Sequence, residues 1–70
     1  MSKLFSSQEI IRTLKKKGFY FVSQRGSHAK FKKKNGKSLI VIVPMDRKEI
    51  PEGTFHSILK QANLEKDDFK

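Results

Sequence analysis

The first eighteen residues carry the pattern of an amphipathic helix with signals at both ends. The apolar positions at helical spacing are Ile10, Ile11 and Leu14. Ser6 is a favourable N-cap, and Glu9 follows it three residues later, as in a capping box. The lysines at 15–17 suit the negative end of the helix dipole, and Gly18 can take the left-handed conformation that ends a helix. The pattern predicts a helix over residues 7–17.

Three strand-like segments follow, each separated from the next by a turn signal. They cover residues 19–24, 28–33 and 37–43. The first is rich in aromatic and branched residues, and the second alternates in residue type. Residues 25–27 form the first predicted turn, and Asn35-Gly36 is a strong signal for a tight hairpin. Pro44 ends the third predicted strand.

A second helical pattern closes the chain after a predicted loop over residues 45–53. Its apolar face is formed by Phe55, Ile58, Leu59 and Ala62. Thr54 is the predicted N-cap and Asn63 the predicted C-cap. Pro51 and Gly53 are taken to keep the loop free of regular structure. A short acidic tail follows.

The predicted order of elements is α-β-β-β-α, which defines an α+β fold class. We expect a two-layer domain over residues 1–70, with a three-stranded antiparallel sheet and both helices on one face. Alternation in the second strand places Ala29 and Phe31 toward the helices. It places His28, Lys30 and Lys32 together on the open face.

The net charge of the chain indicates a polyanionic binding partner. The 70 residues include 16 Lys and Arg against 7 Asp and Glu, a formal charge of +9. No carboxylate lies between Glu9 and Asp46, an interval that contains ten of the basic residues. A solvated, solubilising surface is one interpretation, but solubility does not require such segregation. Binding of phosphates, as in a nucleic acid, explains it better.

Composition also excludes several classes of protein. The chain has no cysteine, which removes disulfides, thiolate catalysis and thiolate metal sites. It is too short to enclose the deep cavity of a large enzyme. Its longest apolar run, residues 39–43, is too short to span a bilayer, and the first residues lack the pattern of a signal peptide. We therefore expect no membrane partner and a cytoplasmic location.

His28 is the residue with the clearest candidate chemistry. It shares its predicted strand face with Lys30 and Lys32 and follows Arg25 and Ser27 of the predicted turn. Neighbouring cations favour the neutral imidazole, which can accept a proton, whereas a bound phosphate favours the protonated form. In RNA, such a base would take the proton of a 2′-hydroxyl, and the cations would hold the phosphate; neither a metal nor a cofactor is required. Spacing alone leaves an ordinary surface histidine as the alternative.

Other residues are weaker candidates. Ser27 has no visible Ser-His-acid arrangement and fits a turn hydroxyl or a phosphate contact. His56 fits a solvent-facing helix residue or a phosphate contact, and two histidines without cysteine do not make a zinc site. Tyr20 is expected to be partly buried in the sheet, where it could still stack on a base. The glycines form no phosphate-binding loop pattern.

Several motifs in this order resemble the HicA toxins of toxin–antitoxin systems, from about Ser6 to Leu64. The shared segments are Gly18-Phe19, Arg25-Gly26-Ser27-His28, Val43-Pro44, Lys48-Glu49-Ile50, Gly53-Thr54 and Ile58-Leu59-Lys60-Gln61-Ala62. The resemblance implies a fold like a double-stranded RNA-binding domain. It implies a ribosome-independent mRNA interferase, an endoribonuclease that arrests translation, and a HicB antitoxin that masks its active site. The family's catalytic histidine corresponds to His28.

One segment departs from the family pattern. Many members carry a second histidine shortly after the Val-Pro pair, where this chain has Met45-Asp46-Arg47. The second proton transfer would then depend on water, on Lys30 or on His28 in both roles. Two other functions stay open on the residues alone: a non-catalytic RNA-binding module, and an interaction domain whose basic face recognises an acidic protein.

Overall fold

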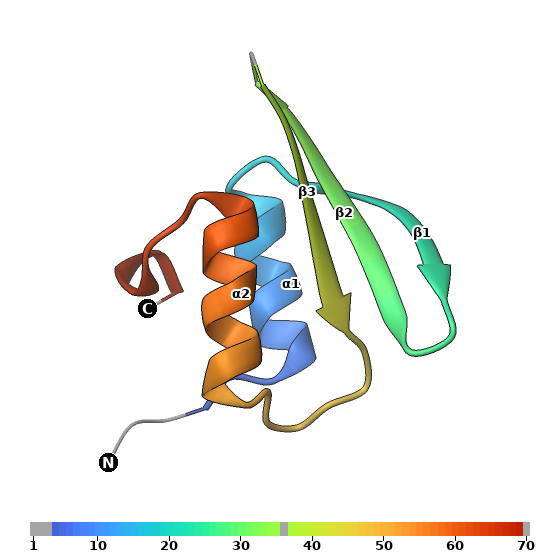
Figure 1. Ribbon diagram of the computed structural model, residues 1–70, viewed down its shortest axis with the longest axis vertical. Coiled ribbons are helices and arrows are strands. Elements are labelled where there is room, and N and C mark those ends of the chain that lie inside the picture. Colours follow the sequence, from blue (N-terminus) through green and yellow to red (C-terminus); the bar gives the residue numbers. More distant parts are fainter. Residues whose placement is uncertain (1–3, 36, 70) are drawn as a thin grey trace.

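The computed structural model describes residues 4–35 and 37–69, which form two helices packed on one face of a three-stranded sheet (Figure 1). The elements in chain order are α1 (Ser7–Lys16), β1 (Tyr20–Arg25), β2 (His28–Asn35), β3 (Lys37–Pro44), α2 (Glu52–Ala62) and a short 3-10 helix, η1 (Lys66–Phe69). The sheet order is β1-β2-β3, with both pairs antiparallel. This is the predicted α-β-β-β-α fold, similar to a double-stranded RNA-binding domain. None of the helices described is long and apolar enough to cross a membrane.

Helix α1 begins and ends with the predicted signals. The Ser6 hydroxyl accepts the Glu9 N–H at 3.1 Å, and the Glu9 carboxylate accepts the Ser6 N–H at 2.9 Å. This reciprocal pair satisfies two N–H groups that a helix start leaves free. Lys17 is the C-cap, and Gly18 follows at φ +98°, which glycine adopts without strain.

Helix α2 begins earlier than predicted, so the expected cap at Thr54 is wrong. Its N-cap is Pro51, whose carbonyl accepts the Phe55 N–H at 2.9 Å, and Gly53 lies inside the first turn. Proline suits a helix start because its fixed φ matches and its missing N–H needs no partner there. Asn63 ends the helix as predicted, in the left-handed conformation at φ +56°.

The three strands extend one or two residues beyond the predicted bounds. β1 runs one residue later, to Arg25; β2 continues to Asn35; and β3 includes Pro44. Asn35 pairs with Lys37 across the β2–β3 ladder, as a tight hairpin requires, although Gly36 of the predicted turn lies outside the described residues. Proline is tolerated in β3 because β3 is an edge strand.

The core lies between the helices and the sheet, and it fixes which face of β2 is open. Its buried apolar residues are Ile10, Leu14, Phe19, Ala29, Phe31, Val41, Val43, Ile50, Phe55, Ile58, Ala62 and Phe69. The inward positions predicted for β2, Ala29 and Phe31, are both in this set. His28 and Lys30 are exposed and Lys32 is half-buried, so the predicted open face is confirmed.

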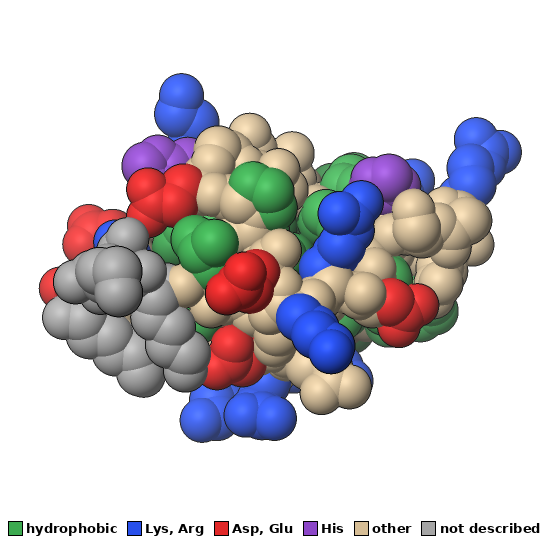
Figure 2. All heavy atoms as spheres, turned by 90° about the horizontal axis from the view of Figure 1, so that it is seen from below, with side chains coloured by type: hydrophobic (Ala, Val, Ile, Leu, Met, Phe, Trp, Pro, Cys, Tyr) green, Lys and Arg blue, Asp and Glu red, His purple; other side chains and the backbone are tan. Residues whose placement is uncertain are grey.

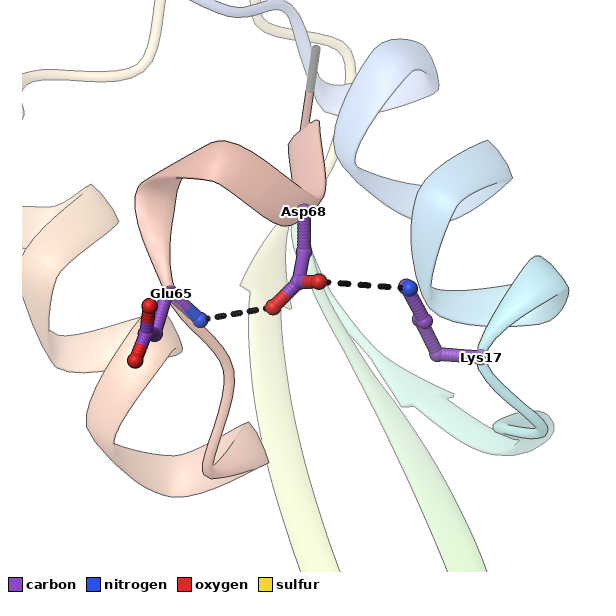
Figure 3. A network of polar contacts seen from close by, with 3 residues as sticks. All are labelled: Lys17, Glu65 and Asp68. Atoms are coloured by element: carbon purple, nitrogen blue, oxygen red, sulfur yellow. Dashed lines mark hydrogen bonds and ion pairs between the residues drawn. The ribbon is translucent and has the colours of Figure 1, made fainter.

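The C-terminal tail folds back as η1, which the sequence pattern did not predict. Phe69 is 5% exposed and packs edge-on against Phe55, with ring centroids 5.1 Å apart. Asp68 caps the turn by accepting the Glu65 N–H at 2.9 Å and pairs with Lys17 at 3.2 Å (Figure 3). The Glu65 N–H and the Lys17 ammonium lower the pKa of Asp68 below its usual range. These contacts tie η1 to the end of α1.

Candidate functional site

His28 opens β2 directly after a two-residue turn that aims it onto the open face. Gly26 takes φ +59° in this turn, a conformation that suits glycine at the first position of a tight hairpin. His28 pairs with Arg25 of β1 and with Pro44 of β3. Paired residues point to the same side of a sheet, so the Arg25 side chain and the His28 imidazole share the open face. The imidazole is exposed.

A β-bulge at Val22 makes this pairing compatible with the core. Phe21 lies opposite Phe31, and Ser23 lies opposite Lys30, so Val22 is the extra residue between them. The Phe21 and Phe31 ring centroids lie 5.8 Å apart on the helix side, where Phe31 is buried and Phe21 is 51% exposed. With a regular ladder counted from that pair, Gln24 instead of Arg25 would face His28. Bulges reposition side chains in this way.

The backbone around His28 is held from behind by the first residue of α1. Ser7 is 2% exposed, and its hydroxyl donates to the Pro44 carbonyl at 2.6 Å and accepts the Arg47 N–H at 3.0 Å. The Ser7 N–H donates to the Arg47 carbonyl at 2.9 Å, and the Met45 N–H donates to the Ser27 carbonyl at 2.7 Å. The β1–β2 turn, the end of β3 and α1 are therefore joined by hydrogen bonds at the chain neighbour and the ladder partner of His28.

The first groove beside His28, the sheet groove, lies on the open sheet face and encloses about 560 Å³. It is lined by Ser23, Gln24, Arg25, His28, Lys30 and Ile42. Figure 2 views the molecule from the end that carries the β1–β2 turn and shows histidine side chains exposed at the surface, with Lys and Arg side chains nearby. The groove combines an exposed imidazole with two cations, an arrangement suited to a phosphate ester.

The structure brings some of the predicted site residues together and leaves others apart. Arg25, His28 and Lys30 line one groove. Ser27 is exposed in the turn but does not line this groove, and Lys32 lies further along the face, opposite Tyr20 and Ile40. His56 is exposed on α2, away from the groove.

The open face also carries exposed apolar side chains, which were harder to predict from the sequence than its positive charge. Tyr20 and Ile40 are each 48% exposed and flank Lys32 in the ladder, and Ile42 pairs with Lys30. Tyr20 was expected to be partly buried, and about half of it is accessible for stacking. Apolar and cationic side chains thus alternate across a surface that the helices leave uncovered.

A second groove, the α2 groove, begins at the same histidine and runs around the edge of β3 to α2. It encloses about 390 Å³ and shares His28 and Ile42 with the first groove. Its other lining residues are Pro44, Arg47, Pro51, Thr54, Ser57, Ile58 and Gln61. Sequence reasoning assigned no function to Arg47, Ser57 or Gln61. The helical spacing of 54, 57, 58 and 61 was the available signal that these side chains share a face.

Within the described residues, no group of three or more His, Cys, Asp or Glu side chains is placed to hold a metal ion. The chemistry available at the site is that of an imidazole, three cations (Arg25, Lys30 and Arg47) and the hydroxyl and amide groups that line both grooves.

Comparison with known proteins gives one family. The family described as the HicA toxin of bacterial toxin-antitoxin matches residues 7–64, from the first residue of α1 to just beyond α2. A comparison with curated proteins gives no match. The matched region contains the turn, the histidine and both grooves. The chain therefore belongs to the HicA toxin family of bacterial toxin–antitoxin systems.

Proposed function

We propose that this toxin is a metal-independent mRNA interferase, an endoribonuclease in which His28 is the general acid–base catalyst. The observation that carries the proposal is the exposed His28 imidazole, which lines a groove with Arg25 and Lys30. Family membership supports a toxin. Because the proposed substrate is mRNA, the proposed site of action is the cytoplasm.

The proposed reaction uses the RNA's own hydroxyl as nucleophile. Neutral His28 takes the proton of a 2′-hydroxyl, and the 2′-oxygen forms a bond to the adjacent phosphorus as the bond from phosphorus to the 5′-oxygen breaks. The products are a 2′,3′-cyclic phosphate and a 5′-hydroxyl. The leaving 5′-oxygen takes a proton from His28, Lys30 or water.

The cations have separate parts in this proposal. Arg25 and Lys30 stabilise the charge that builds on the phosphoryl oxygens, since both line the groove with the imidazole. Lys32 and Ser27 lie outside the groove and would hold neighbouring phosphates along the RNA. Tyr20 is exposed beside Lys32 and would stack on a base.

The antitoxin partner that the family implies would cover the same face. We propose a HicB-like protein that places carboxylates against Lys30 and Lys32 and apolar side chains against Tyr20 and Ile40. Complementary charge would speed its association, and apolar burial would lengthen the lifetime of the complex.

A non-catalytic RNA-binding module is the second candidate, and the dsRNA-binding-like fold with its basic face favours it. Such a module would bind RNA with strong salt dependence and produce no fragments. An interaction domain for an acidic protein would instead ignore RNA at low salt.

Substrate chemistry tests the proposal directly. The protein is incubated in EDTA with an RNA and with the same sequence as 2′-deoxy oligonucleotide. We expect cleavage of the RNA alone, with fragments that end in a cyclic phosphate. Cleavage of the deoxy substrate would contradict attack by the 2′-oxygen, and intact RNA after long incubation would support the binding module.

A further inference from the structure

The groove between β3 and α2 differs in chemistry from the groove on the open sheet face, although His28 lines both. The sheet groove contains two cations, Arg25 and Lys30, beside the hydroxyl of Ser23 and the amide of Gln24. The α2 groove contains one cation, Arg47, with the hydroxyls of Thr54 and Ser57 and the amide of Gln61. The α2 groove thus has one cation fewer and one hydroxyl more than the sheet groove, so it would hold a ligand less by charge and more by directional hydrogen bonds.

The fold fixes one of these polar groups in place, and it fixes the backbone that carries a second. Gln61 Oε1 accepts the Ile42 N–H at 2.9 Å, which orients the amide and leaves its Nε2 group to donate to a ligand. The backbone of Arg47 is bonded to Ser7 through both its N–H and its carbonyl. Preorganised groups lose little conformational entropy when a ligand binds.

The hydrogen bond from the Ile42 N–H to Gln61 argues against a peptide strand as the occupant of the groove. An incoming strand would need the free N–H groups at the outer edge of β3. At Ile42 that N–H is already bonded to Gln61. The groove's volume, about 390 Å³, lies in the range of small-ligand pockets, about 300–1,000 Å³. A single nucleotide is a ligand of this size class and has both a base edge and a ribose to hydrogen-bond.

We propose that the α2 groove binds the nucleotide next to the scissile phosphate and sets the base preference of cleavage. The RNA strand would run from the cationic sheet groove past His28 and around Ile42 and Pro44 to α2. Arg47 would hold a phosphate, and Ser57 and Gln61 would contact the base or the ribose. This inference rests on the proposed function, because it takes His28 as the point where the strand is cut.

Binding of a short 2′-fluoro RNA tests the groove without cleavage, since this RNA lacks the 2′ nucleophile. The double variant Arg47→Gln/Ser57→Ala changes two groove side chains. Arg12→Gln is the charge-matched control because Arg12 is exposed on α1 and lines neither groove. We expect the double variant to weaken Kd about tenfold beyond the control, equivalent to about 1.4 kcal/mol. The NMR signal of the Gln61 side-chain amide should shift on titration of the wild type.

Cleavage of a randomised RNA pool supplies a second measurement. The double variant should change the base preference at one position beside the cut, whereas Lys30→Gln should lower cleavage at all sites alike. Affinity and preference equal to those of Arg12→Gln, with no shift at Gln61, would overturn the groove assignment even if wild-type cleavage is normal. If the wild type binds through the groove but never cleaves, the nuclease proposal fails together with the role in base preference, and only nucleotide binding in the groove stands.

Discussion

Arg25 stands opposite His28 in the β1–β2 ladder, and this pairing coexists with the Phe21–Phe31 pair because β1 carries an extra residue at Val22. Phe31 of the first pair is buried in the core and Phe21, which is 51% exposed, lies against its ring, whereas the arginine–histidine pair belongs to the open face. The bulge therefore lets Phe21 and Arg25, which are four residues apart, point to opposite faces of the sheet. It also places a guanidinium next to the candidate catalytic imidazole.

Arg25→Gln should weaken RNA binding more at low salt than at high salt. The loss of one phosphate contact should reduce the slope of log K against log salt by about 0.7 to 1. The measurement is RNA affinity at four or more salt concentrations, with Arg12→Gln as the control for the loss of a charge elsewhere. A slope equal to that of the control would show that Arg25 does not contact the RNA backbone.

Ser7→Ala should destabilise the fold and loosen the site together. Removal of the hydroxyl leaves the Pro44 carbonyl and the Arg47 N–H without their partner in a buried position. Such a loss costs about 1–3 kcal/mol in the free energy of unfolding. Urea denaturation measures it, with Ser38→Ala on the exposed part of β3 expected to stay within about 0.5 kcal/mol of wild type. Equal stabilities for the two variants would contradict the structural role of Ser7.

The Lys17–Asp68 contact predicts a pH dependence of stability with a defined sign. The pKa of Asp68 is lowered in the folded protein by the Glu65 N–H and by Lys17. Its stabilisation is therefore fully present above the unfolded value, about 3.9, and is lost as the pH falls through the lower folded value. Asp68→Asn should lower Tm slightly at pH 7 and match wild type in strong acid. A Tm difference that persists or grows in acid would contradict this assignment.

Association with the proposed HicB-like antitoxin should depend on the lysines of the open face. Lys30→Gln/Lys32→Gln should slow association at low salt and change it little at high salt, because electrostatic steering is screened. Stopped-flow kinetics with the purified antitoxin would measure the rate. An unchanged rate at low salt would place the antitoxin on another surface.

Signals from neighbouring residues in the sequence correctly predicted the ends of the helices at Ser6 and Asn63 and the two faces of β2. The capping box of Ser6 and Glu9, the left-handed Asn63 and the inward side of β2 all follow from neighbouring residues. The exposure of His28 follows from the same alternation. The error at α2 was also local, since Thr54 and Pro51 are both acceptable at a helix start and the backbone used the proline.

Features that join distant segments could not be read from the sequence. In the sequence Ser7 is an ordinary residue for the first turn of a helix. Its bonds to Pro44 and Arg47 arise only because the β3–α2 loop passes α1. The α2 groove likewise requires β3 and α2 to lie side by side, as the bond between Ile42 and Gln61 shows. The burial of Phe69 depends on a partner, Phe55, contributed by another element.

Catalysis by the His28 imidazole is tested by the rate at which His28→Ala cleaves RNA in the presence of EDTA. His56→Ala is the matched control, an exposed histidine on α2 that lines neither groove. Both variants should keep the wild-type circular dichroism spectrum and bind 2′-fluoro RNA. We predict that His28→Ala loses at least about 100-fold in cleavage rate, as expected for loss of a general acid–base group, and that His56→Ala cleaves at the wild-type rate. Cleavage by His28→Ala at the wild-type rate, or cleavage that requires a divalent metal, would contradict metal-independent catalysis by His28.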